Sequence, residues 1–199
     1  MRKRILMTTA VANRAKQGKR ARTRDKLIQA AAVVIGEKGY DRASLEEIAA
    51  RAGMTRGAVY GNFKNKEELF LLLIETRWKP ILPPFVPGAT LKQQMRILGK
   101  TVAKEALARR DQAAAATAFQ LYTLTHEAMR ARLTAQNAAV YRRMAKGLLK
   151  FVPAKQLPMP AEKFVRVLDA LITGLLFTYF QTPKLVTEDV IIAAFETLA

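Results

Sequence analysis

The sequence reads SLEEIAARAGMTRGAVYGNF from Ser44 to Phe63, and this stretch predicts two short helices joined by a glycine turn. Ser44 and Glu47 have the spacing of a capping box, in which each side chain bonds the backbone N–H of the other. Gly53 suits the left-handed backbone of a tight turn, and Thr55 is a preferred cap for the second helix. The stretch therefore predicts a helix-turn-helix.

The second helix has an outward side suited to DNA. An α-helix of this size fits the major groove, where an arginine can fork onto a guanine and an aromatic ring can contact a thymine methyl. The outward residues are Thr55, Arg56, Gly57, Tyr60 and Asn62. The wedge between the helices is apolar and is formed by Ile48, Ala49, Val59 and Phe63. The alternative is an ordinary helical hairpin inside a bundle.

The rest of the chain predicts an all-α fold of about nine helices, because apolar residues recur at helical spacing and strand alternation never persists. The first helix is expected from Thr23 to Lys38, and Asn65 caps another that runs towards Trp78. Further helices are expected at about 90–110, 112–124, 126–152, 161–181 and 187–198. The expected organisation is a flexible basic arm (1–22), a DNA-binding domain of three-helix type (23–79), a proline-rich connection (80–89) and an effector-binding and dimerisation domain (90–199).

The positive charge is unevenly distributed. The 199 residues carry 34 Lys and Arg against 16 Asp and Glu, a net charge of +18, which implies a polyanionic partner. Residues 1–24 hold nine basic residues and no acid, residues 25–70 are neutral, and residues 71–155 carry fifteen basic and four acidic residues. Contact with DNA requires positive charge on one face only. The basic surface of 71–155 is either a solvated helix face or a site that favours an anionic effector or DNA.

Several classes of function lack the residues they need. The chain has no cysteine and one histidine, His126, which argues against thiolate or imidazole metal sites and fits a cytoplasmic protein. His126 is expected at the surface or at a helix start. Neither a phosphate-binding glycine loop nor a nucleophile elbow occurs, so we expect no enzyme and no cofactor. The apolar runs Ile5–Met7 and Ala170–Phe180 are too short for a secretion signal and a membrane span.

The segment from Thr23 to about Ile74 resembles the DNA-binding domain of the TetR family of bacterial transcriptional regulators. The resemblance is carried above all by TRGAVYGNFKNKEELF, residues 55–70, with its Tyr60 and Phe63 spacing and its Lys66-Glu-Glu-Leu start of a helix. It continues more weakly through the C-terminal two-thirds. The family often has histidine at position 62 and a hydroxyl residue at 43, where this chain has Asn62 and Ala43, so the operator sequence is not predicted.

The resemblance implies a homodimer that binds a palindromic DNA operator and releases it when a small-molecule effector binds. Thr55, Arg56, Gly57, Tyr60 and Asn62 match recognition-helix positions. Ser44 and Lys66 match phosphate-contacting positions. Lys64 lies beside Lys66 at a predicted helix start, where free backbone N–H groups favour phosphate. The basic N-terminal arm is a candidate for an additional DNA contact, for which the minor groove is the candidate location.

The C-terminal region has apolar faces too broad for one exposed stripe. Self-association of the last two helices would cover them and give the two-fold axis that two half-sites require; the alternative is that they pack on their own domain. The expected dimer residues are Phe164, Leu168, Leu171, Leu175, Tyr179, Ile191 and Phe195. Candidates for an effector pocket are Met95, Leu98, Phe119, Tyr122, Met144 and Leu148, although apolar residues at helical spacing are more often core.

The sequence thus predicts a ligand-responsive transcriptional regulator, most simply a repressor. An architectural DNA-binding protein without an effector would explain the charge, but not the long apolar C-terminal region. A membrane-surface protein would leave the helix-turn-helix unexplained.

Overall fold

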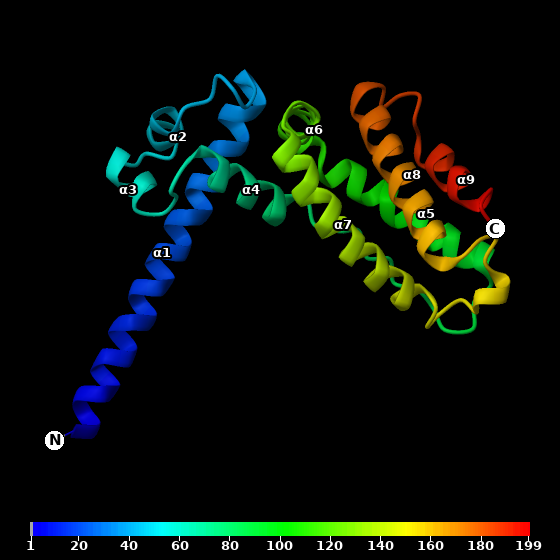
Figure 1. The fold of residues 1–199 in the computed structure, drawn as a ribbon, viewed down its shortest axis with the longest axis horizontal. Coiled ribbons are helices and arrows are strands. Elements are labelled where there is room, and N and C mark those ends of the chain that lie inside the picture. Colours follow the sequence, from blue (N-terminus) through cyan, green and yellow to red (C-terminus); the bar gives the residue numbers. More distant parts are fainter. Residues whose placement is uncertain (1) are drawn as a thin grey trace. The chain divides into compact units, whose positions relative to one another are not determined.

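The structure is a computed structural model that describes the backbone of residues 2–199 and the side chains of residues 18–199 apart from Arg77. Every regular element in this part of the chain is helical, so the all-α prediction is confirmed. The α-helices, labelled in Figure 1, are α1 (Arg2–Lys38), α2 (Leu45–Arg51), α3 (Arg56–Tyr60), α4 (Lys66–Arg77), α5 (Leu91–Ala108), α6 (Ala113–Thr125), α7 (Glu127–Leu148), α8 (Ala161–Gln181) and α9 (Glu188–Glu196). Two short 3-10 helices cover Arg110–Gln112 and Ala154–Gln156.

The chain divides into two compact units, which we describe separately. Unit 1 comprises residues 1–79 together with 114–122, and unit 2 comprises residues 80–113 and 123–199. The first unit thus contains α1 to α4 and most of α6. The sequence did not predict that part of α6 packs with the N-terminal helices.

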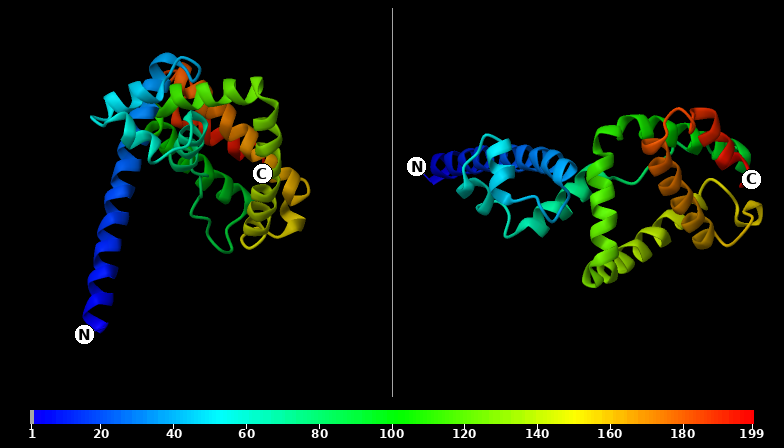
Figure 2. Two further views of the ribbon diagram at one scale, coloured as in Figure 1. Left: turned by 60° about the vertical axis from the view of Figure 1, so that its left-hand side comes forward. Right: turned by 90° about the horizontal axis from the view of Figure 1, so that it is seen from above.

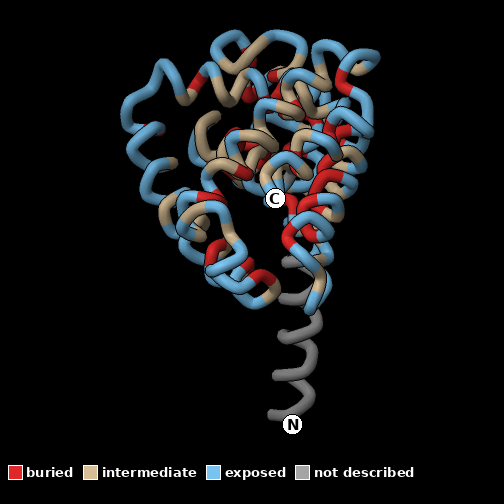
Figure 3. The backbone as a smooth tube through the Cα atoms, turned by 90° about the vertical axis from the view of Figure 1, so that its right-hand side faces the viewer, coloured by how far each residue is buried: buried red, intermediate tan, exposed pale blue. Residues whose placement is uncertain are grey.

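Unit 1 is built around the C-terminal half of α1, against which α2 and α4 pack (Figures 1 and 2). Four apolar side chains of α1 are at most 3% exposed, namely Leu27, Ala31, Val34 and Ile35. They meet a buried set from the following helices that comprises Ile48, Ala49, Val59, Phe63, Leu69, Phe70 and Leu73. The buried stretches alternate with exposed ones along the chain, as amphipathic helices around one core require (Figure 3).

The predicted start of the first helix was wrong. Helix α1 begins at Arg2 rather than after Thr23, and the Thr23 hydroxyl donates to the Lys19 carbonyl oxygen at 3.0 Å within the helix. A threonine can cap a helix or bond one turn back inside it, so the residue type alone did not mark a helix end. The predicted arm therefore continues α1. The side chains of Arg2, Lys3, Arg4, Arg14 and Lys16 lie outside the described residues.

Unit 2 is centred on α5, which packs against α9 and α8, while α8 also packs against α7. Its fully or nearly fully buried side chains come from all of these helices and include Met95, Leu98, Val102, Ala106, Leu148, Val152, Phe164, Leu176, Ile191 and Phe195. Gln94 is also buried, and its side-chain amide bonds the backbone N–H and carbonyl of Val86. This pairing satisfies a buried polar group and holds the loop before α5.

Four of the seven residues predicted at a dimer interface are instead part of this core. Phe164, Leu168, Ile191 and Phe195 are 0–7% exposed within their own chain. The face of α9 is covered by α5, so these side chains offer no surface to a second copy. Leu171, Leu175 and Tyr179 remain partly exposed on α8.

In unit 2 the helices α5 and α9 pack closely against one another at Gly99. A Cβ atom on Gly99 of α5 would lie 2.8 Å from the Cα of Ile192 in α9, a distance that backbone cannot accommodate without moving. Gly99 is therefore required because α9 passes directly over it.

Gly99→Ala is expected to destabilise unit 2 by about 1–3 kcal/mol relative to the control Gly147→Ala, measured by thermal or urea unfolding. Both changes bring the same gain in helix propensity, but a Cβ on Gly147 of α7 would meet nothing within 4 Å. Equal stability of the two variants would show that α9 does not pack this closely on α5.

Helix α8 is long and apolar enough to cross a membrane by length and composition, and it is the only helix of this kind in the described residues. A helix that packs in a protein core meets the same criterion. Phe164, Val165, Leu168 and Leu176 of α8 are buried in unit 2, but only 22% of its apolar window is buried. Most of the other large apolar side chains of α8 are therefore only partly covered by their own chain.

Candidate nucleic-acid interface

Helices α2 and α3 form the predicted helix-turn-helix. The Ser44 hydroxyl accepts from the Glu47 N–H at 3.1 Å, and the Glu47 carboxylate accepts from the Ser44 N–H at 3.2 Å. Gly53 has a φ of 65°, which confirms the left-handed turn, and the Thr55 hydroxyl accepts from the Ala58 N–H at 3.3 Å. Local chemistry thus starts both helices where the sequence predicted.

One side of α3 is buried and the other is open. Val59 is fully buried, whereas Thr55, Arg56, Gly57 and Tyr60 are exposed. We call these four exposed residues the reading face. A Cβ on Gly57 would meet only the Thr55 hydroxyl oxygen, at 3.9 Å, so the fold does not require a glycine at this position. The absence of a side chain leaves the surface of α3 flat here. The structure therefore groups four of the eight predicted DNA-contacting residues on one surface.

Glu46 of α2 joins two residues of the reading face and was not predicted. Its Oε1 atom accepts from the Tyr60 hydroxyl at 3.1 Å and lies 3.1 Å from Nε of Arg56, whose guanidinium carbon is 5.4 Å from the centre of the Tyr60 ring. The pKa of the Glu46 carboxyl is lowered by its own backbone N–H, then by the Tyr60 hydroxyl and by Arg56, so it is ionised at neutral pH. Ten residues separate Glu46 from Arg56, and no sequence periodicity relates positions across a turn.

Asn62 does not lie on the reading face. It follows the C-cap Gly61 of α3, and its side-chain amide donates to the Ala58 carbonyl oxygen at 2.7 Å. Its Oδ1 atom is buried without a hydrogen-bond partner among the described atoms. The prediction of a base contact from Asn62 assumed a longer recognition helix; here the chain turns after Tyr60, and the amide points back onto the helix end.

Lys66 holds the loop between α1 and α2. Its ammonium donates to the carbonyl oxygens of Tyr40, Asp41 and Ala43 at 2.8, 3.1 and 3.0 Å, and it lies 4.4 Å from the centre of the Tyr40 ring. An ammonium has three N–H donors, and all three are used. In this arrangement Lys66 has no donor for a phosphate, contrary to what its sequence position suggested.

Lys64 differs from Lys66. Its side chain is exposed, and its backbone N–H donates to the Glu68 carboxylate at 2.7 Å near the start of α4, where Asn65 forms the cap. The positive charge of Lys64 therefore remains available next to the helix start. Of the predicted phosphate contacts, Ser44 and Lys64 keep polar groups at the surface.

Two arginines of α1 secure the other end of the recognition helix. Arg20 donates to the Gly61 carbonyl oxygen at 3.5 Å, and Arg24 donates to the Asn62 carbonyl oxygen at 3.3 Å. Arg24 also lies 4.8 Å from the centre of the buried Phe63 ring. Cations at the carboxyl end of a helix are favourable for its dipole. Two basic side chains of α1 therefore fix the position of the C-terminal end of α3.

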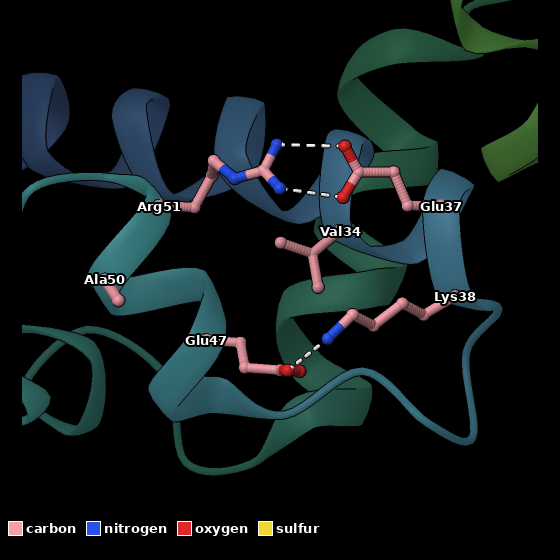
Figure 4. A pocket seen from close by; sticks show the side chains of 6 residues that line it. All are labelled: Val34, Glu37, Lys38, Glu47, Ala50 and Arg51. Carbon is pink, nitrogen blue, oxygen red and sulfur yellow. Dashed lines mark hydrogen bonds and ion pairs between the residues drawn. The ribbon is translucent and has the colours of Figure 1, made fainter.

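A shallow groove lies between α1 and α2 and is lined by Val34, Glu37, Lys38, Glu47, Ala50 and Arg51 (Figure 4). The two terminal nitrogens of Arg51 donate to the two carboxylate oxygens of Glu37 at 3.1 and 2.7 Å, and Lys38 forms an ion pair with Glu47. Each partner cation lowers the pKa of its carboxyl. The two cations and two anions of the groove are paired with one another. We therefore interpret the groove as a structural contact that stabilises the packing of α1 against α2.

The six predicted pocket residues are divided between the two units. Met95, Leu98 and Leu148 are buried in unit 2, where Met144 is partly buried, whereas Phe119 and Tyr122 belong to unit 1. The second cavity described, of about 270 Å³ in unit 2, is lined by none of the six. It is formed by residues 88–90, 149–151, Pro153 and Gln156.

Phe119 and Tyr122 of α6 stack into an aromatic cluster of unit 1. Tyr40 has ring-centre distances of 4.6 Å to Phe70 and 4.3 Å to Tyr122, and Phe119 lies 5.5 Å from Phe70. Burial and a hydrogen bond with Tyr122 raise the pKa of Tyr40. The cluster fastens α6 to the unit that contains the helix-turn-helix. His126 is exposed at the N-cap position of α7, as predicted.

Comparison with known proteins supports this interpretation of the helix-turn-helix. The model of the family described as bacterial regulatory proteins, tetR family, matches residues 27–73. The chain is 37% identical over 71 residues to the HTH-type transcriptional regulator SrpR of Pseudomonas putida, covering 36% of this chain and 33% of SrpR. It is 43% identical over 54 residues to the HTH-type transcriptional repressor BepR of Brucella suis, covering 27% of this chain and 26% of BepR. These matches span about a third or less of either relative.

A solved structure extends the similarity of the fold. NalD, the secondary repressor of the MexAB-OprM multidrug efflux pump in Pseudomonas aeruginosa, aligns with a TM-score of 0.62 and 25% identity over 88% of this chain and 93% of that one. The architecture of both units therefore has a known counterpart, whereas the family model matches residues of unit 1 only.

Proposed function

Because this chain belongs to the TetR family of bacterial regulatory proteins, we propose that it is a dimeric repressor that binds a palindromic operator and is released by a small-molecule effector. The observation that carries the proposal is the reading face. Arg56, Gly57 and Tyr60 are exposed on a helix whose opposite side, with Val59, is fully buried. A rigid helix with an arginine and an aromatic side chain outward is suited to the major groove.

A dimer is supported by the surface of α8. The face of α8 that its own unit leaves partly exposed combines small and apolar residues, namely Val167, Ala170, Leu171 and Gly174. Small residues allow two helices to approach closely, and a second copy would cover this face around a two-fold axis. We therefore place the dimer interface on this side of α8, rather than on the buried set that includes Phe164 and Phe195.

Effector control is supported by the position of α6. Its residues 114–122 belong to unit 1 through the aromatic cluster, while the chain on both sides of them belongs to unit 2. We propose that an effector bound in unit 2 acts on DNA affinity through α6. BepR and NalD are both described as repressors, which supports repression as the proposed role. A chromosomal operator would require a cytoplasmic protein, and this is the location that we propose.

The test is selection of bound fragments from the source genome by the full chain. The expected result is a shared inverted repeat whose half-sites are centred about 34–36 Å apart, one turn of DNA. Enriched fragments with no common sequence and a binding constant set by salt alone would instead support the architectural DNA-binding alternative. The genes next to the selected fragments would direct the search for the effector.

The N-terminal extension of α1 is expected to add phosphate contacts. Deletion of residues 1–21 removes seven basic residues, and each phosphate left unneutralised reduces the slope of log K against log salt by roughly 0.9. We expect weaker binding and a shallower slope in a fluorescence titration at several salt concentrations. An unchanged slope would show that the extension stays off the DNA. The deletion also removes the hydrogen bond from Arg20 to the Gly61 carbonyl, but it leaves the contacts of Arg24 at the end of α3 in place.

A further inference from the structure

The contact between Glu46 and the reading face places a negative charge where DNA is expected to bind. The side chains of Glu46 and Arg56 are 47% and 72% exposed, and Tyr60 is 46% exposed. A carboxylate near phosphates opposes binding at every sequence, because like charges repel. Such a residue lowers nonspecific affinity. It increases specificity only if it also acts on the contacts that distinguish bases.

The geometry shows what that second effect is. Glu46 engages Arg56 through Nε, and among the described atoms neither terminal nitrogen of that guanidinium has a hydrogen-bond partner. The two terminal nitrogens form the fork that recognises the O6 and N7 acceptors of guanine. The Glu46 carboxylate therefore contacts the Nε atom of Arg56 and leaves the two terminal nitrogens of the guanidinium available for a base.

Tyr60 is held in the same way. Its hydroxyl proton is donated to Glu46, and its ring lies beside the guanidinium of Arg56. The hydroxyl oxygen can still accept a hydrogen bond from a base amino group, but it has no proton for a phosphate. One carboxylate oxygen thus orients both side chains of the reading face towards base contacts.

Orientation has an energetic consequence. A free arginine side chain samples many rotamers, and it loses this freedom when it docks on a base. A side chain that is already restrained by an ion pair and a ring contact loses less conformational entropy on binding. A larger part of the free energy of the base contact then contributes to affinity for the correct sequence.

We propose that Glu46 is a positioning residue of the DNA interface, which increases discrimination between operator and other DNA by restraining Arg56 and Tyr60 while lowering nonspecific affinity. This inference rests on the proposed function, because it requires that the reading face contacts bases. It makes a prediction that a simple count of charges does not, since loss of a negative charge should reduce specificity.

The experiment uses a duplex selected from a random-sequence library by the wild-type chain, and a scrambled duplex of the same length. Dissociation constants for both are measured for the wild type, Glu46→Gln and Glu46→Ala at one salt concentration. Discrimination, the ratio of the two constants, is expected to fall about tenfold in Glu46→Ala, a loss within the range that one arginine–guanine contact supplies. Binding of the scrambled duplex is expected to become tighter in both variants.

Glu75→Gln is the matched control, because it removes one exposed carboxylate from unit 1 on α4, away from α3. It is expected to leave discrimination unchanged. A double-mutant cycle with Arg56→Ala supplies the second readout: if Glu46 acts through Arg56, removal of Glu46 should cost much less discrimination when Arg56 is already absent. Thermal unfolding of each variant shows whether unit 1 remains folded.

Unchanged or increased discrimination in Glu46→Ala and Glu46→Gln would overturn the inference and identify Glu46 as a competitor of DNA. Additive losses in the cycle would also overturn it, because Glu46 would then act independently of Arg56. Failure of the proposed function looks different: the wild-type chain itself would yield no selected sequence.

Discussion

Replacement of Arg56 by alanine is expected to abolish operator-specific binding. One arginine–guanine contact contributes about 1–3 kcal/mol of discrimination, and a symmetric dimer loses it in both half-sites, so specific affinity should fall roughly 30-fold or more. Binding to scrambled DNA should weaken far less, because the loss there is one charge per chain. The measurement is a gel-shift or fluorescence titration with the selected and the scrambled duplex.

Arg51→Ala is the control for this change. Arg51 is also an exposed arginine of the helix-turn-helix, but it forks onto Glu37 on the side of α2 that faces α1 (Figure 4). Its loss removes the same charge and should leave base discrimination intact. Retention of full discrimination by Arg56→Ala, or an equal loss in both variants, would mean that α3 does not read bases through this side chain.

Lys66→Met is expected to destabilise unit 1 by about 2–4 kcal/mol, because it removes three charge-assisted hydrogen bonds and leaves the carbonyl groups of the loop between α1 and α2 unpaired. Methionine keeps much of the side-chain length, so the lost packing is small. Urea unfolding followed by circular dichroism measures the effect. DNA affinity under conditions where the variant is folded should change little, since the ammonium has no donor left for phosphate.

Lys64→Met should show the opposite behaviour. Its exposed side chain makes no hydrogen bond or ion pair among the described residues, so its loss should leave stability within about 0.5 kcal/mol of the wild type. It should weaken DNA binding at all sequences and reduce the salt dependence, as loss of a phosphate contact does. A stable Lys66→Met variant with impaired DNA binding would restore the phosphate contact suggested by the family resemblance and contradict the structural role.

The elements that could be predicted from sequence are those with local causes. Ser44, Thr55 and Asn65 each cap a helix through a side chain that bonds a backbone N–H three residues on, and Gly53 permits the one backbone conformation that joins α2 to α3. These interactions involve residues that are close in the chain, so their spacing is visible in the sequence. Helix α8 was predicted from 161 to 181 for the same reason, since prolines bound its start.

The start of α1 shows where local chemistry fails. Thr23 has the right residue type for a cap, but the decision between a cap and the interior of a helix depends on whether the preceding residues are helical. The assignment of Phe164, Leu168, Ile191 and Phe195 to a dimer interface shows a related limit: apolar spacing identified the inward faces of α8 and α9, but could not distinguish a partner chain from α5. The dimer itself stays a prediction.

The sequence by itself determined the fold class, the helix-turn-helix and four exposed residues of α3, because caps, turns and helical periodicity act over a few residues. Tertiary structure decided the roles of individual polar groups. Lys66 became a clamp on the preceding loop, Asn62 turned back onto α3, and Glu46 came to hold Arg56 and Tyr60. Each depends on atoms brought together by packing, and hydrogen-bond partners within about 3 Å across a turn follow from no spacing in the chain.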